Sequence, residues 1–210
     1  MTASYTRREA LQHLTDCCPQ LGGFIQDYGP IGIPSDTEKD LFRYLSRAIT
    51  YQQLSGKAAE TIHGRFATLF DNELPEPGQA ASMSIEKLRS SGLSGSKARA
   101  IQDLAVKTLD GTLASRASLV RRENDAVIEN ICQVWGIGPW TVQMLLMFNF
   151  RRPDVMPATD LGVQKGVQVI YSLSELPSPD EVVARTTHLS PYRSVASLYF
   201  WRAADTVVLS

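Results

Sequence analysis

The chain has 210 residues, 43% of them hydrophobic, which is enough to bury a core as one domain or as two small lobes. Its three cysteines have the spacing of neither a disulfide framework nor a metal site, and they encode no iron–sulfur cluster. The first residues are charged where a secretory signal is apolar, and no apolar run approaches the ~18 residues of a membrane span. We therefore expect a globular monomer without a membrane partner, in the cytoplasm or nucleoid, or in the nucleus of a eukaryote.

A formal net charge of −1 and a pI near 6.3 differ from the basic composition that is typical of nucleic-acid binders. Positive charge is nevertheless concentrated between residues 87 and 122, which hold eight Lys and Arg against two acidic residues. Lys97 and Arg99, in the middle of this segment, are candidate contacts to DNA phosphates. A solvated helical face would have the same composition.

Apolar residues at helical spacing predict helices along most of the chain. One expected helix starts near residue 36 and ends at a break near residues 54–56. The other expected helical ranges are 6–17, 57–70, 83–90, 96–109, 124–134, 139–150, 161–171, 181–187 and 191–208. Glycine and proline predict a helix fragment followed by a loop over Leu21 to Pro34, a linker over Asp71 to Gln79, and a loop over Leu173 to Glu181.

A short glycine turn, Gly136-Ile137-Gly138, separates two of these helices. Glycine lets the backbone approach a ligand closely, and Pro139 suits the first turn of the following helix. The amides of that turn favour an anion, such as a DNA phosphate. A glycine pair of this kind also serves as an ordinary helix C-cap, so the turn alone does not separate the two interpretations.

The longer pattern is more specific: hxGhGxW, then a helix, then a proline-flanked loop that ends in Asp160. It resembles the helix-hairpin-helix base-excision DNA glycosylases, and within them the alkyladenine-type (3-methyladenine) branch. The resemblance extends from about Leu41 to Asp205 and implies an all-α, two-lobed fold with a cleft between the lobes. One lobe is expected from residues 1–80 and 172–210, and the other, with the hairpin and the aspartate, from residues 81–171.

The same resemblance implies flipping and hydrolytic excision of alkylated, cationic purines such as 3-methyladenine and 7-methylguanine in base excision repair. Asp160 would be the catalytic carboxylate, although an aspartate before a helix is also a common N-cap. Strand-nicking relatives carry a lysine nucleophile two residues beyond the hairpin. Trp140 stands there instead, so we expect a monofunctional enzyme without lyase activity.

Electron-rich rings would hold a cationic purine by cation–π attraction. The candidates for this base pocket are Trp140, Phe24, Tyr28, Tyr192 and Trp201, each of which could equally belong to the core.

The segment AIxxQQxS, at a turn between two helices, resembles the element that these glycosylases insert into the minor groove. Gln53 or Leu54 is then the wedge that fills the hole left by the extruded nucleotide, and the alternative is a plain interhelical turn. No cofactor is expected to be required, and the resemblance implies at most a monovalent cation at the hairpin. Double-stranded DNA with damaged bases is the expected partner.

Two alternatives stay open at the level of sequence. Helix-hairpin-helix pairs also occur in proteins that bind DNA without catalysis, in which case Asp160 is only a cap. A glycosylase for oxidised or mismatched bases is the other alternative, because lesion choice depends on pocket shape.

Overall fold

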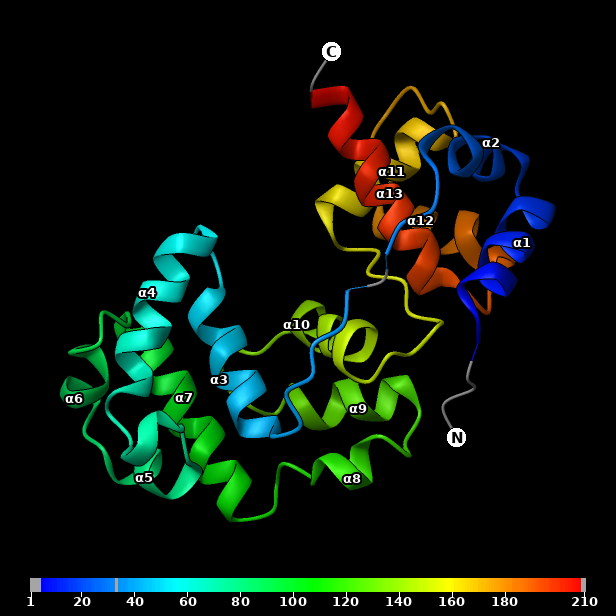
Figure 1. Cartoon of the computed structure of the whole chain (residues 1–210). Helices are drawn as coiled ribbons and strands as arrows, with labels where there is room; N and C mark the ends of the chain where they lie inside the picture. The colour runs from blue at the N-terminus through cyan, green and yellow to red at the C-terminus, as the bar shows by residue number, and fades with distance from the viewer. Residues whose placement is uncertain (1–4, 33, 209–210) are drawn as a thin grey trace. The chain divides into compact units, whose positions relative to one another are not determined.

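The computed structural model describes residues 5–32 and 34–208, with side chains as far as residue 206. Ile33, in the predicted loop after the second helix, lies outside these residues. Within the described ranges all regular structure is helical, so the prediction of an all-α fold is confirmed (Figure 1). The α-helices are α1 (Arg7–Cys17), α2 (Pro19–Tyr28), α3 (Leu41–Tyr51), α4 (Gly56–Ala67), α5 (Pro77–Ser82), α6 (Ile85–Arg89), α7 (Gly95–Leu109), α8 (Arg116–Leu119), α9 (Asn124–Ile131), α10 (Pro139–Met144), α11 (Leu161–Ile170), α12 (Pro179–Thr186) and α13 (Arg193–Val208).

The helix that follows the glycine turn is α-helical at its start and π-helical at its end. After α10 the chain continues as a π-helical turn, Leu145–Asn149, in which the Phe150 N–H donates to the carbonyl of Leu145. Short π-helical segments are frequent near functional sites. The predicted helix over residues 139–150 is therefore present, with a wider last turn.

Several other segments contain more helix than the sequence indicated. Residues 19–28 form a complete helix, and the expected linker over 71–79 contains a 3₁₀ turn, Asp71–Glu73, and the start of α5. The helix α12 begins before the predicted residue 181 because Ser178 and Glu181 form a capping box. None of the helices in the described part combines the length and apolar character that a membrane span requires.

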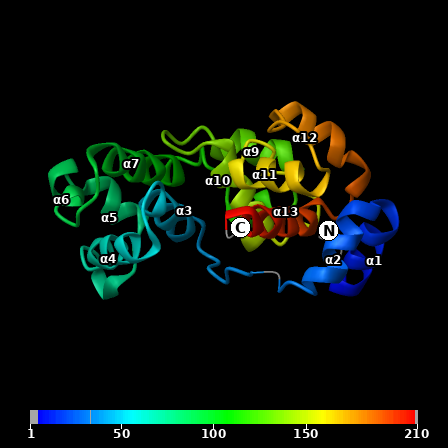
Figure 2. The same ribbon diagram turned by 90° about the horizontal axis from the view of Figure 1, so that it is seen from above.

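The chain divides into two compact units, unit 1 from residues 1–36 and 143–210, and unit 2 from residues 37–142. The predicted lobe boundaries at 80/81 and 171/172 are corrected to 36/37 and 142/143. Packing explains the difference: α3 packs on α4 and α7 inside unit 2, and α11 packs on α13 inside unit 1 (Figures 1 and 2). The hairpin and Asp160 therefore belong to different units.

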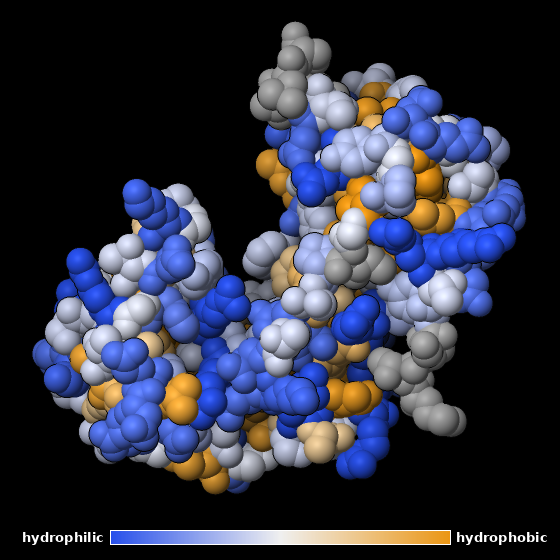
Figure 3. All heavy atoms as spheres, in the orientation of Figure 1, coloured by the Kyte–Doolittle hydropathy of each residue, from blue (hydrophilic) through white to orange (hydrophobic). Residues whose placement is uncertain are grey.

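In unit 1 the core lies mainly between α11 and α13, with α1 and α2 against them. The two helices approach most closely at Gly166, where an added Cβ would stand 1.9 Å from the carbonyl oxygen of Phe200. A side chain of any size at Gly166 would force the helices apart. In both units hydrophilic residues predominate on the face drawn in Figure 3. The apolar residues recur at a spacing that turns them toward the core, so polar residues remain on the surface.

Candidate active site and nucleic-acid interface

The hairpin lies in unit 2, and its two glycines have different surroundings. Gly136 has φ of +81°, and a Cβ there would be 3.1 Å from the Cβ of Ala100 in α7. The close approach at Gly136 is therefore to the protein itself. Gly138 is exposed, and a Cβ there would meet no protein atom within 4 Å. Its carbonyl accepts the first hydrogen bonds of α10, from Thr141 and Val142. Gly138 is the position at which an outside ligand can approach.

A carboxylate of α7 fixes the start of the hairpin. Asp103 Oδ2 accepts a hydrogen bond from the Trp135 N–H at 2.7 Å and forms an ion pair with Lys107 at 2.7 Å. The Lys107 ammonium also donates to the carbonyl of Gln133. Sequence reasoning counted Asp103 and Lys107 only as part of the charge balance, because no local pattern indicates that they face the hairpin.

We call Gln52-Gln53-Leu54, which joins α3 to α4, the wedge turn. Gln53 has φ of +56°, in the left-handed region that side chains rarely adopt, and both Gln53 and Leu54 are exposed, Leu54 by 39%. Two adjacent exposed side chains at the tip of a turn agree with the predicted wedge. That either of them inserts into DNA stays a prediction.

The structure places Lys97 beneath this turn. Its ammonium donates to the carbonyls of Thr50 at 2.9 Å and of Gln52 at 2.8 Å, which are among the last carbonyls of α3. Burial lowers the pKa of Lys97 below that of a free lysine. An ammonium held in this way stabilises the end of α3, which accounts for Lys97 without a phosphate contact. Arg99 is exposed and stays a candidate contact to DNA.

Asp160, in unit 1, is the N-cap of α11, as the sequence predicted. Its Oδ1 accepts hydrogen bonds from the Val163 N–H at 2.9 Å and from Trp201 Nε1 at 2.8 Å. Gly162 makes the second bond possible, because a Cβ there would lie 2.7 Å from Trp201 Cδ1 and 3.0 Å from Asp160 Oδ1. The carboxylate is thus held in one orientation by a backbone N–H and an indole. Sequence reasoning missed Gly162.

The loop that leads to Asp160 is fixed by the start of α13. Asp154 forms an ion pair with Arg193 at 2.6 Å, and its other oxygen accepts a hydrogen bond from Ser190 at 2.9 Å. Burial raises the pKa of Asp154, but the hydrogen bonds from Arg193 and Ser190 and the guanidinium charge outweigh it and hold the pKa below its usual value. Ser194 also bonds to this loop, through the Val155 N–H and the Arg152 carbonyl. A loop tied at several points can hold a catalytic group still.

Four of the five predicted pocket aromatics lie in unit 1, and Trp140 lies in unit 2. Within unit 1, Trp201 contacts Asp160 and stacks on Phe148, with ring centroids 6.2 Å apart. Phe24 and Tyr28 stack on each other at 5.6 Å. The remaining two are Tyr192, which packs against the rings of His13 and Tyr5, and Trp140, which is 44% exposed at the start of α10 in unit 2. Trp201 is the ring that the structure brings to the candidate catalytic residue.

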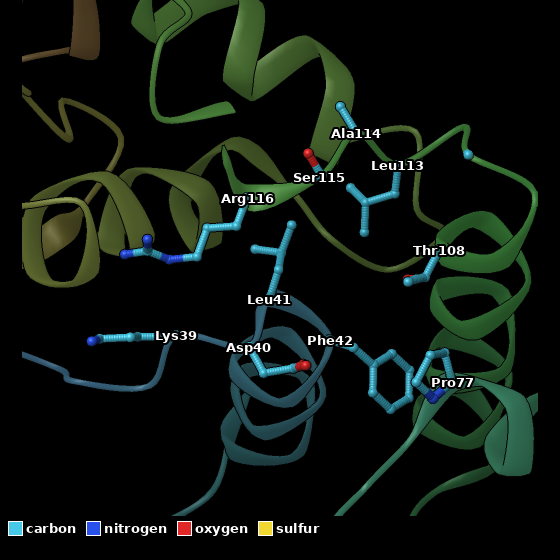
Figure 4. Close-up of a pocket in the computed structure, with 11 residues that line it drawn as sticks. Lys39, Asp40, Leu41, Phe42, Pro77, Thr108, Leu113, Ala114, Ser115 and Arg116 are labelled. Atoms are coloured by element: carbon cyan, nitrogen blue, oxygen red, sulfur yellow. The ribbon is translucent and has the colours of Figure 1, made fainter. Parts of the chain in front are cut away.

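A separate hollow of about 430 Å³ lies in unit 2. Figure 4 shows the apolar side chains of Leu41, Phe42 and Leu113 beside it, while Lys39 and Arg116 extend away to one side. Its carboxylate, Asp40, caps α3 by accepting a hydrogen bond from the Arg43 N–H. This hollow holds none of the predicted site residues.

A comparison with known protein families shows which family this chain belongs to. Residues 46–191 match the model of the HhH-GPD superfamily base excision DNA repair proteins. The chain belongs to this superfamily. The matched range includes the wedge turn, the hairpin and Asp160, whereas Trp201 lies beyond it.

Relatives within the superfamily are similar over most of their length. The DNA-3-methyladenine glycosylase 1 of Schizosaccharomyces pombe is 34% identical over 80% of this chain and 74% of its own length. A solved structure of an S. pombe 3-methyladenine DNA glycosylase in complex with abasic DNA superposes with a TM-score of 0.81 at 32% identity, covering 92% of this chain and 95% of that one. A DNA-3-methyladenine glycosidase from Bacillus halodurans superposes with a TM-score of 0.85 at 30% identity, covering 100% and 94%.

The different surroundings of the two glycines give a prediction for this HhH-GPD hairpin. Gly138→Ala is expected to fold normally, because the new methyl group enters open space. It should nevertheless weaken binding to duplexes of every sequence, since the methyl group stands where a phosphate would approach the backbone. Fluorescence anisotropy with undamaged duplex measures the effect. Unchanged affinity in the folded variant would mean that Gly138 does not face DNA.

Proposed function

We propose that the protein is a monofunctional DNA glycosylase that flips out alkylated purines, such as 3-methyladenine and 7-methylguanine, and hydrolyses their N-glycosidic bonds. Family membership and the two solved relatives support the reaction class. The observation in this chain that carries the proposal is the Asp160 carboxylate, held by the Val163 N–H and Trp201 Nε1 at the start of α11. A cap needs only the first of these bonds. The second gives the carboxylate a fixed orientation beside an aromatic ring.

The proposed chemistry follows from where charge develops. Cleavage of the bond between C1′ and the purine leaves positive charge on the sugar, and a fixed anion beside C1′ stabilises that state. Asp160 supplies this anion. It also orients the water that adds to C1′, and the proton that this water loses passes to the carboxylate or to solvent.

The leaving group needs little help if it is already cationic. Methylation at N3 or N7 gives the purine a positive charge and weakens the glycosidic bond, so no residue has to protonate the base. An indole or phenol ring favours such a base over a neutral one by roughly 0.5 to 2 kcal/mol through cation–π attraction. Among the predicted pocket rings, Trp201 is supported by its contact with Asp160 and Trp140 by its exposure.

The DNA contacts in this proposal come from unit 2. The backbone around Gly138 binds a phosphate, Gln53 or Leu54 enters the minor groove, and Arg99 adds a cationic contact. The hairpin turn, residues 134–138, has no acidic side chain, so it offers a cation only neutral carbonyl oxygens. Backbone carbonyl oxygens alone can hold a monovalent ion, as in the filters of potassium channels, and such an ion would add positive charge near the bound phosphate.

No lysine stands where a strand-nicking enzyme would need its nucleophile. Trp140 occupies that position, and the next lysine in the chain, Lys165, is exposed on α11. A Schiff base requires an amine that can reach C1′. The product of the reaction should therefore be an intact strand with an abasic site.

Base release from duplex DNA treated with a methylating agent tests the proposal. Chromatography of the released bases should show 3-methyladenine and 7-methylguanine, and the strand should break only after alkali treatment. Tight binding to the duplex without any base release would instead indicate a DNA-binding protein without catalysis. Release of oxidised or mismatched bases alone would move the protein to another lesion class.

A further inference from the structure

We propose that Gln52 is a positioning residue that locks the wedge turn onto the hairpin, so that both meet DNA as one rigid element. Its side-chain Nε2 donates to the carbonyl of Gly136 at 3.1 Å and has a longer contact, 3.5 Å, with Thr141 Oγ1. This bond joins two turns that are 84 residues apart in sequence. The inference rests on the proposed function, since it assigns both turns to DNA.

The partner of Gln52 packs closely against α7. The Gly136 carbonyl can only accept a hydrogen bond, which fixes the carboxamide with its nitrogen toward the hairpin. Ala100 of α7 lies close to Gly136, since a Cβ at Gly136 would be 3.1 Å from the Ala100 Cβ. The side chain of Gln52 is therefore anchored to a point of unit 2 that packs on α7.

A second anchor holds the main chain of the same residue. The Gln52 carbonyl accepts a hydrogen bond from the Lys97 ammonium, which also holds the carbonyl of Thr50. Gln52 is thus tied to α7 by its backbone and to the hairpin by its side chain. Gln53 and Leu54 follow directly, exposed and with Gln53 in the left-handed conformation. The base of the wedge turn is held from two directions.

Rigidity at this place has a mechanical role in base flipping. A side chain that enters a stacked duplex meets resistance from the bases it separates. If the turn could tilt away from the hairpin, that resistance would bend the turn and leave the nucleotide stacked. The bond from Gln52 to Gly136 prevents this tilt while the hairpin holds the phosphate. Its contribution should be large for a well-stacked lesion and small for one already unstacked by a mismatch.

The test compares Gln52→Ala with Gln102→Ala. Gln102 is a matched control: its Nε2 also donates to a backbone carbonyl of unit 2, that of Met83, at 3.0 Å. Single-turnover excision is measured on 7-methylguanine paired with cytosine and on the same base opposite thymine. Gln52→Ala should slow the paired substrate on the order of 10- to 100-fold, by analogy with small misplacements of positioned groups, and the mismatched one much less. Gln102→Ala should affect neither.

Two further measurements isolate the mechanism. In a double-mutant cycle with Gln53→Ala and Leu54→Ala, Gln52→Ala should add little once the wedge side chain is gone, because it acts through that side chain. Fluorescence of 2-aminopurine at the flipped position should rise on binding of the wild-type protein and rise less with Gln52→Ala, which reports insertion without chemistry.

Equal slowing of both substrates, additive effects in both cycles, or unchanged fluorescence in Gln52→Ala would overturn the role of Gln52. If the wild-type protein releases no methylated base, the proposed function fails, and the 2-aminopurine signal still decides whether Gln52 supports insertion into DNA.

Discussion

Asp160→Asn is expected to lower the single-turnover rate of base excision on the order of 100-fold or more, the usual cost of losing one preorganised electrostatic group. Asparagine keeps an oxygen that can accept the hydrogen bonds from Val163 and Trp201, so the cap and its surroundings should survive. Only the negative charge is lost. Quenched-flow or manual time courses with enzyme in excess measure the rate, and anisotropy measures DNA binding, which should change little.

A matched variant separates the charge from the cap. Asp40 caps α3 with the same geometry, accepting a hydrogen bond from the Arg43 N–H at 2.9 Å, and the proposed chemistry does not use its carboxylate. Asp40→Asn should have a melting temperature close to that of Asp160→Asn and a normal excision rate. A fully active Asp160→Asn would show that Asp160 serves only as a helix cap.

Gly166→Ala should lower stability more than alanine at any of the other glycines, because its added Cβ makes the shortest contact among them. The new Cβ would stand 1.9 Å from Phe200 O and 2.5 Å from Phe200 Cα, both backbone atoms of α13. Backbone cannot rotate away as a side chain can, so α11 and α13 must separate. Overpacking typically costs ~1–3 kcal/mol, occasionally more, and we expect about 3 kcal/mol or more here. For a chain of this length that corresponds to a melting temperature lower by roughly 6–12 °C.

Gly64→Ala in α4 is the control for that substitution. A Cβ at Gly64 meets nothing within 4 Å, so alanine should raise the free energy of unfolding by roughly 0.5–1 kcal/mol through its better helix propensity. Urea and thermal unfolding of both variants give the comparison. Equal effects in the two variants would contradict the close packing of α11 on α13.

Gly166→Ala should also lower the rate of base excision. Asp160 caps α11, and its indole partner, Trp201, is on α13, next to Phe200. Separation of these two helices would lengthen the bond between Trp201 Nε1 and Asp160 Oδ1. Under conditions where the variant is still folded, excision should therefore be slower than in the wild-type protein.

Local sequence determined most of the helices and several site features. Apolar spacing located the helices on both sides of Gly136-Ile137-Gly138, and the position of Asp160 before an apolar helix predicted its role as a cap. These features depend on residues three or four positions apart, which contact each other in any helix. The family pattern around the hairpin likewise lies in one continuous stretch.

Long-range packing decided the rest. The boundaries of the units, the place of Lys97 beneath α3 and the close approach of α13 at Gly166 involve segments that no local pattern connects. The bonds from Gln52 to Gly136 and from Trp201 to Asp160 span 84 and 41 residues. The sequence by itself thus determined the helices, the hairpin and the candidate carboxylate. Only the tertiary structure decided which side chains hold them in place, because such contacts form when distant helices pack and leave no periodic signal in either helix.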